Sequence, residues 1–169
     1  YGAVTFNQPI GEWDTTSVTD MIQMFRGASA FNSDLSWNVA NVTTMNYMFR
    51  DATVFGGNIS NWDVSIVSMY GMFFGASSFN GDVSNWNVSQ VGNMGYMFGG
   101  AVMFNQDISD WVTSSVTNMT SMFGGATSFN QSLHNWDTIN VTSMRYMFTN
   151  AVVFNGDIGG WNTSNVNSM

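Results

Sequence analysis

The sequence predicts an α/β repeat solenoid, a coil with one short parallel strand and one short helix in each repeat of about 25 residues. Three observations predict it. Tryptophan recurs at positions 13, 37, 62, 86, 111, 136 and 161, phenylalanine keeps the same step, and apolar residues at helical spacing follow each tryptophan. One such unit cannot bury its own apolar face, whereas stacked units cover one another. We expect a single domain over residues 1–169, an excerpt of a longer array, with about seven repeats that start near Phe6, Phe31, Phe55, Phe79, Phe104, Phe129 and Phe154.

The first half of each repeat is expected to form the strand. In the copy FNQDISDW, Phe104, Ile108 and Trp111 are apolar and the residues between them are polar, which suits a strand with one exposed face. An asparagine follows the phenylalanine in every copy except the one with Gly56. We predict that these asparagines form a ladder whose side-chain amides bond backbone groups at a bend.

The second half of each repeat is expected to form the helix. Residues 116–126 place apolar side chains at i, i+3, i+6, i+7 and i+10, which is one face of a helix. Thr117 precedes this run as an N-cap, and the same slot holds Thr19, Thr43, Ser68, Gly92, Thr142 and Asn167. Before the alanine of each copy stands a residue that tolerates positive φ, as the left-handed end of a helix requires. These residues are Gly27, Asp51, Gly75, Gly100, Gly125 and Asn150.

Repeated side chains at constant positions favour a packed interior. The tryptophan row predicts one stacked corner of the coil, with an exposed platform for sugars as the alternative. The methionines predict adaptable core packing. Two copies are one residue short, one before Trp37 and one between Val67 and Met69. A partial threonine row raises an ice-binding surface as a further alternative; it comprises Thr15, Thr113, Thr138 and Thr163.

Charge and composition exclude several kinds of partner. The chain has no lysine and no cysteine, and its formal net charge is −8. Nucleic acids and anionic lipids need clustered basic residues, so we expect neither. No run approaches the about 18 apolar residues of a membrane helix, so we expect no direct membrane insertion. Because chemistry needs unlike groups at one point, and His134 and Glu12 are the single residues of their types, we expect no enzyme.

The copies of FNQDISDW…SSVTNMTSMF resemble the BspA-like leucine-rich-repeat surface proteins. They are most similar to the subgroup of 25-residue repeats found in mycoplasma and marine bacterial surface lipoproteins. The resemblance covers residues 6–169, with departures at Gly56, Gly57, Val112 and His134. It implies a right-handed coil like that of leucine-rich repeats on a secreted or cell-surface bacterial protein, with a role in adhesion or protein binding.

Acidic and hydroxyl residues near the tryptophans are the candidate binding residues. Asp34, Asp82, Asp107 and Asp157 share one repeat position, and other Asp and Asn residues follow the tryptophans. Such residues suit turns, and a calcium site at Asp82 and Asp107 is the alternative. We expect no other cofactor. The exposed positions that we select for binding are Ser36, Ser60, Ser84, Ser109 and His134, together with those four aspartates.

These observations predict a non-enzymatic binding or adhesion scaffold. Its partner would be a protein or glycan on a host or neighbouring cell, contacted through the exposed repeat face, and end-to-end self-association is a further expectation. A purely structural spacer is the alternative from another functional class. The expected location is extracellular or at the cell surface.

Overall fold

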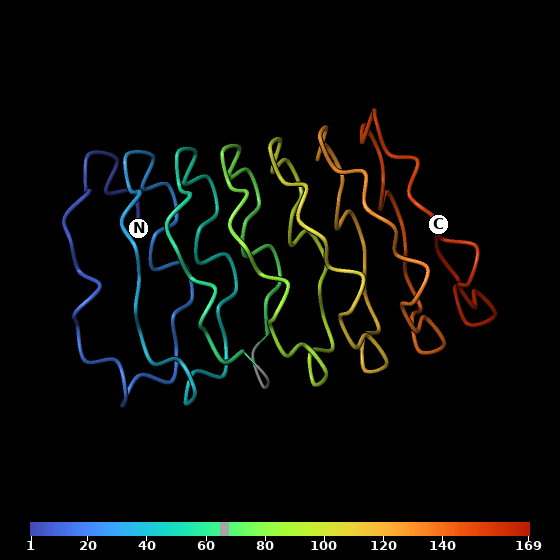
Figure 1. The fold of residues 1–169 in the computed structure, drawn as a ribbon, viewed down its shortest axis with the longest axis horizontal. Helices are drawn as coiled ribbons and strands as arrows, with labels where there is room; N and C mark the ends of the chain where they lie inside the picture. The colour runs from blue at the N-terminus through green and yellow to red at the C-terminus, as the bar shows by residue number, and fades with distance from the viewer. Residues whose placement is uncertain (65–67) are drawn as a thin grey trace.

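The protein is a stack of coils that run along one long axis from the N-terminus to the C-terminus (Figure 1). This computed structural model describes residues 1–64 and 68–169. We number the coils 1 to 7 from the phenylalanine that begins each repeat. They comprise residues 6–30, 31–54, 55–78, 79–103, 104–128, 129–153 and 154–169. Val67, beside which the sequence analysis places a shortened repeat, lies outside the described residues.

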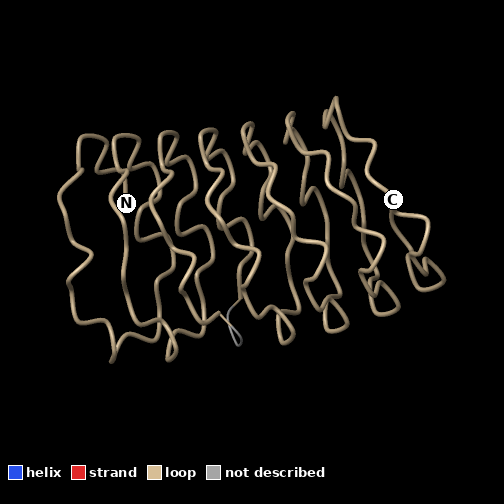
Figure 2. Cartoon of the chain, viewed as in Figure 1, coloured by secondary structure: helices blue, strands red, loops and turns tan. Residues whose placement is uncertain are grey.

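The described residues form no helix and no extended strand, and Figure 2 shows loops and turns throughout. β-Type pairing between the described parts of neighbouring coils consists of isolated parallel bridges. These are Asp20 with Thr44, Thr44 with Ser68, Asn93 with Asn118, Asn118 with Ser143, and Ser143 with Ser168. The expected α/β fold, with a strand and a helix in each repeat, is therefore wrong. The comparison with a leucine-rich-repeat solenoid is wrong for the same reason.

Two consecutive β-turns replace the expected helix in each of coils 1 to 6. In coil 2 the Met48 N–H donates to the Met45 carbonyl and the Ala52 N–H to the Phe49 carbonyl, each three residues back. The third residue of each turn, Tyr47 and Asp51, has positive φ (56° and 59°), which identifies type II turns. The N–H groups of Met45, Tyr47, Phe49 and Asp51 donate to carbonyls of coil 3 instead of continuing a helix.

The predicted positive φ before each alanine is present, but it belongs to a β-turn and not to the end of a helix. Positive φ occurs at all six residues that precede the alanine, but each is the third residue of a turn. Gly27, Asp51, Gly75, Gly100, Gly125 and Asn150 form this row. The expected N-cap threonines are wrong, because no helix follows them. Instead, the Thr43, Thr117 and Thr142 hydroxyls donate to the carbonyl of the matching residue one coil earlier.

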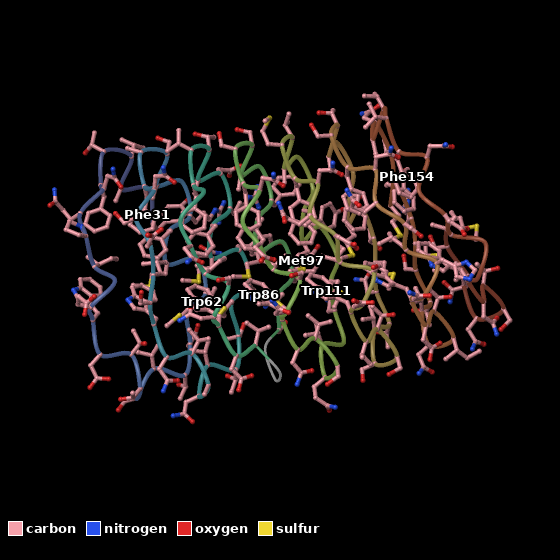
Figure 3. The ribbon with its side chains drawn as sticks, viewed as in Figure 1. Phe31, Trp62, Trp86, Met97, Trp111 and Phe154 are labelled. Carbon is pink, nitrogen blue, oxygen red and sulfur yellow. The ribbon has the colours of Figure 1, made fainter. Side chains whose placement is uncertain are left out.

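Rows of stacked rings fill the centre of the coils. The rings of Phe98, in coil 4, and Phe104, at the start of coil 5, stack with centroids 3.8 Å apart. Phe98 also stacks on Phe73 of coil 3 and Phe123 of coil 5, with centroids 5.7 and 5.8 Å away. Figure 3 shows the labelled side chains, including Trp62, Trp86 and Trp111, following one another along the stack. The methionine row is buried beside them, as predicted.

Hydrogen bonds between coils satisfy the indole N–H groups and most of the buried threonine hydroxyls of this interior, whereas the buried Thr44 hydroxyl has no partner among the described residues. The Trp86 Nε1–H donates to the Ile59 carbonyl of the coil before, 3.1 Å away. The hydroxyls of Thr113 and Thr138 are 1% exposed and donate to carbonyls of the coil after. Among the described residues, no helix is long and apolar enough to cross a membrane.

Candidate functional site

The predicted asparagine ladder is present along one edge of the stack. The Asn130 backbone N–H donates to Asn105 Oδ1, and the Asn155 N–H donates to Asn130 Oδ1. The Gly56 N–H donates to Asn32 Oδ1 in the same way, but Gly56 has no side-chain oxygen to accept a bond from the next coil. The amide oxygens of the ladder accept hydrogen bonds that join neighbouring coils, so the role of the ladder is structural.

Three of the four predicted aspartates, Asp82, Asp107 and Asp157, stabilise local turns, which confirms that interpretation for these three. Asp82 Oδ1 accepts hydrogen bonds from the Ser84 N–H and hydroxyl, at 2.9 and 2.7 Å. These bonds, the one to the hydroxyl first, lower the pKa of the Asp82 carboxyl. Asp107 accepts from the Ser109 N–H in the same way, and its pKa is also lowered. In coil 3 an amide performs this role, because Asn58 Oδ1 accepts from the Ser60 N–H and hydroxyl.

The aspartate turns predict acid sensitivity. A depressed folded-state pKa contributes stability above the ordinary carboxyl pKa of about 4, and this contribution is lost as pH falls through the folded value. We therefore expect the melting temperature to fall below about pH 4. Asp14 accepts from the Thr16 N–H and hydroxyl in the same way, and these bonds lower its pKa. The triple variant D14N/D82N/D107N keeps one acceptor oxygen in each turn and should show a smaller fall, as measured by thermal unfolding from pH 7 to pH 2. An equal fall in the wild type and the variant would contradict this role for the carboxylates.

Of the serines and the histidine that were predicted to be exposed, Ser36 and His134 are exposed, whereas Ser60, Ser84 and Ser109 are half-buried. His134 Nδ1 is 3.3 Å from Asp157 Oδ2, with both side chains more than half exposed. Asp34 Oδ1 accepts from the Asn58 N–H of the next coil, and Ser36 is exposed. Within residues 1–64 and 68–169, no three His, Asp or Glu side chains gather as a metal site would require. As a binding surface these residues stay a prediction, because most of their polar atoms already bond within the protein.

Two surfaces considered from the sequence are not available to ligands. The five tryptophans of coils 2 to 6 are at most 3% exposed, so they form no sugar platform. Thr15, Thr113 and Thr138 are buried as well, so this row presents no flat face to ice.

The surface made by the paired turns carries the positive charge of the protein. We call it the turn face: the two residues inside each Met-x-x-Met and the two inside each Phe-x-x-Ala of coils 1 to 6. All three arginines of the chain, Arg26, Arg50 and Arg145, lie in these positions. Of the eleven acidic residues, only Asp51 does. A chain with net charge −8 therefore concentrates its cations on one side.

An aromatic groove crosses the turn face. Its first part is a hollow of about 300 Å³ lined by Tyr47, Arg50, Tyr70, Phe74 and Tyr96, from coils 2 to 4. Its second part, of about 380 Å³, shares two of these rings and continues to coil 6. The second part is lined by Phe74, Tyr96, Gly99, Ser121, Gly124, Gly125, Tyr146, Thr149 and Asn150. We use the name aromatic groove for both linings together.

The rings of the groove meet edge to face. The Tyr70 ring centroid lies 5.3 Å from that of Tyr47 and 5.5 Å from that of Tyr96, with interplanar angles of 89° and 63°. Phe74 and Tyr96 are 5.8 Å apart at 65°. This geometry is a favourable aromatic arrangement, and it orients successive rings differently along the groove. All four rings are half-buried.

Glycines of the following coil make room for these rings. A Cβ at Gly71 would come within 2.5 Å of the Tyr47 ring, and Cβ atoms at Gly95 and Gly99 would come within 3.0 Å of Tyr70 and Phe74. Each ring therefore lies across a neighbouring coil whose residue lacks a side chain. The sequence signal was available in the Met-x-Tyr-Met and Met-Tyr-Gly-Met variants of the repeat, from which no prediction was drawn.

Arg50 supplies the charge at one end of the groove. Its guanidinium carbon lies 5.3 Å from the Tyr47 ring centroid and 5.0 Å from that of Phe74. Its Nε–H donates to Asp51 Oδ2 at 3.2 Å. In the part of the chain that the structure describes, the two terminal amino groups of Arg50 make no hydrogen bond. They remain free to donate to a ligand.

Tyrosine hydroxyls add polar groups to the same surface. Burial, followed by a hydrogen bond with Tyr47, raises the pKa of Tyr70 to about 12. This hydroxyl is therefore already engaged with Tyr47. At the other end of the groove, Arg145 Nη2 donates to the Tyr146 hydroxyl at 2.8 Å and its guanidinium lies over that ring.

Comparison with known proteins identifies one family. The model of the family described as "Mycoplasma protein of unknown function, DUF285" matches residues 1–70 and again residues 67–169. No curated protein matches the chain. No solved structure matches it either.

Proposed function

The chain belongs to the family described as Mycoplasma protein of unknown function, DUF285, and from that premise we propose that it is a non-catalytic binding module of an extracellular or cell-surface protein. The aromatic groove is the observation that carries the proposal. The other long surfaces of the stack use their polar side chains to join coils or close turns. The groove instead presents half-buried rings and an arginine with unused donors.

A partner that touches several coils at once gains from the repetition. Each coil adds one small set of contacts, and contacts held on one rigid stack act at high effective concentration. The proposed partner is a protein or glycan on a host or neighbouring cell. The location at the surface rests on the resemblance to BspA-like surface proteins, and protease treatment of intact cells tests it.

A glycan and protein array tests the proposed function. We expect the wild-type chain to bind at least one class of partner, and Tyr96→Gly to abolish that binding because it removes a ring shared by both parts of the groove. Ser84→Ala with Ser109→Ala, on the edge selected from the sequence, serves as the matched control and should leave binding unchanged.

The array also separates this proposal from its rivals. If the serine variant loses binding and Tyr96→Gly retains it, the binding surface lies at the turns of Asp82 and Asp107 and not in the aromatic groove. Absence of binding to every class would overturn the proposal and favour the structural spacer.

A further inference from the structure

We propose that the aromatic groove binds an acidic polysaccharide whose negative charges are spaced along the chain. This inference rests on the proposed function and names the class of its ligand. It comes from the chemistry of the groove lining: aromatic rings, hydroxyl groups and few but localised cations.

The shape of the groove favours a linear ligand. The two hollows share Phe74 and Tyr96, so they form one path from coil 2 to coil 6. At a spacing of about 4.8 Å between neighbouring coils, this path is roughly 20 Å long. A small molecule would fill one hollow only, whereas an extended oligomer contacts both.

The lining matches the two-sided character of a sugar ring. The C–H faces of a sugar pack on aromatic rings, and its hydroxyls exchange hydrogen bonds with polar neighbours. Tyr96 and Phe74 supply rings, while Ser121, Thr149 and Asn150 supply hydroxyl and amide groups on the same path. Tyr47 and Tyr70 add further rings in the first part of the groove.

Charge placement favours an anionic sugar. Arg50 lies in the groove at coil 2, with its Nε–H paired to Asp51 and its terminal amino groups unpaired within the described part of the chain, and Arg145 contacts Tyr146 at coil 6. A guanidinium with free terminal amino groups makes two parallel hydrogen bonds to a carboxylate or sulfate. Two cations set far apart in a protein of net charge −8 suit a ligand with spaced anions. A nucleic acid carries one charge per phosphate and would be repelled.

Backbone bonding disfavours an extended peptide as the occupant. A peptide that adds a strand needs free backbone N–H and C=O groups at an edge. On the turn face of coil 2, the N–H groups of Tyr47 and Asp51 already donate to coil 3. Those of Met48, Arg50 and Ala52 donate within the turns. Recognition here therefore depends on side chains.

Titration calorimetry with a hyaluronan hexasaccharide tests the inference. This probe carries a carboxylate on every second sugar, and its carboxyl-reduced counterpart keeps the same chain without charge. We expect the wild type to bind the acidic form at least about tenfold more tightly than the reduced form, since a charge-assisted hydrogen bond is lost with the carboxylate. Binding should weaken as salt increases.

Three variants assign the binding to the groove. Arg50→Met should lose about tenfold in affinity or more. Arg26→Met removes the same charge at coil 1, where the guanidinium lies over Tyr1 outside the groove, and should change little. Tyr96→Gly should abolish binding without unfolding the protein, because Gly71 holds the equivalent position of coil 3 with the same positive φ.

The outcomes distinguish this inference from the proposed function. Equal binding of the acidic and reduced oligosaccharides, no binding of either, or equal losses in Arg26→Met and Arg50→Met would overturn it. Tighter binding of a hexaglutamate peptide, lost in Tyr96→Gly, would also overturn it and assign the groove to an acidic peptide. In these cases the binding module stands if the array still detects a partner that requires Tyr96.

Discussion

Replacing Phe98 with alanine is expected to lower the free energy of unfolding by about 3–5 kcal/mol, the usual cost of removing a fully buried aromatic side chain. Phe98 is 0% exposed and stacks on Phe79 in its own coil and on rings of both neighbouring coils. The cavity cannot close easily, because the rings around it are fixed by their own stacks. Since stability in a stack depends on contacts between neighbours, a defect in this central coil weakens both sides.

Denaturant unfolding followed by circular dichroism measures this effect. Phe98→Leu retains most of the apolar volume and should cost less than about 1.5 kcal/mol. Val152→Ala, at a side chain 76% exposed, should stay within about 0.5 kcal/mol of the wild type. If Phe98→Ala behaves like Val152→Ala, the ring stacks do not hold the coils together.

The buried positions were predictable because the repeat pattern identifies them. A side chain that returns at the same step must meet its own copies when the coils stack, and this predicted the tryptophan and methionine rows. The asparagine ladder follows from the same logic, with Gly56 as the one interruption. The aspartate turns were predictable because Asn58 and Asp82 occupy the same repeat position. The feature that these two residue types share is a side-chain acceptor oxygen, which closes the turn.

The helix was not predictable from apolar spacing alone. A pair of type II turns also places apolar residues three and four positions apart, so Met45, Met48 and Phe49 match both patterns. The deciding feature is positive φ at Tyr47, a residue type that rarely adopts it and therefore gives no sequence signal. Hydrogen bonds to the next coil hold Tyr47 in this conformation. The sequence of a single repeat does not show these bonds.

The groove was missed because its residues do not repeat. Tyrosine occupies the third position of the first turn in coil 2 and the second position in coil 3. A search for constant positions therefore discards the variation that builds this surface. Only the three-dimensional stack shows that Tyr47, Tyr70 and Tyr96 meet edge to face.

Gly57→Ala is expected to destabilise the protein by about 1–3 kcal/mol, the usual cost of forcing extra volume into a packed site. A Cβ at Gly57 would overlap the backbone carbonyl oxygen of Ser33 in the preceding coil and lie 2.8 Å from its carbon. It would also approach the Phe55 ring to 3.1 Å. Because the first obstacle is backbone, relief requires coils 2 and 3 to move apart, which weakens the stack between them.

Gly92→Ala provides the matched control for this substitution. The nearest atom to a Cβ at Gly92 is the Ser115 carbonyl oxygen at 3.9 Å, and its φ is not positive. Reduced freedom of the unfolded chain should make this change neutral or stabilising by up to about 1 kcal/mol. Thermal unfolding of the two variants measures the difference. Equal melting temperatures would mean that the close approach of coils 2 and 3 is absent. A lower melting temperature for Gly57→Ala than for Gly92→Ala would show that backbone contact, as well as ring stacking, sets the spacing between coils.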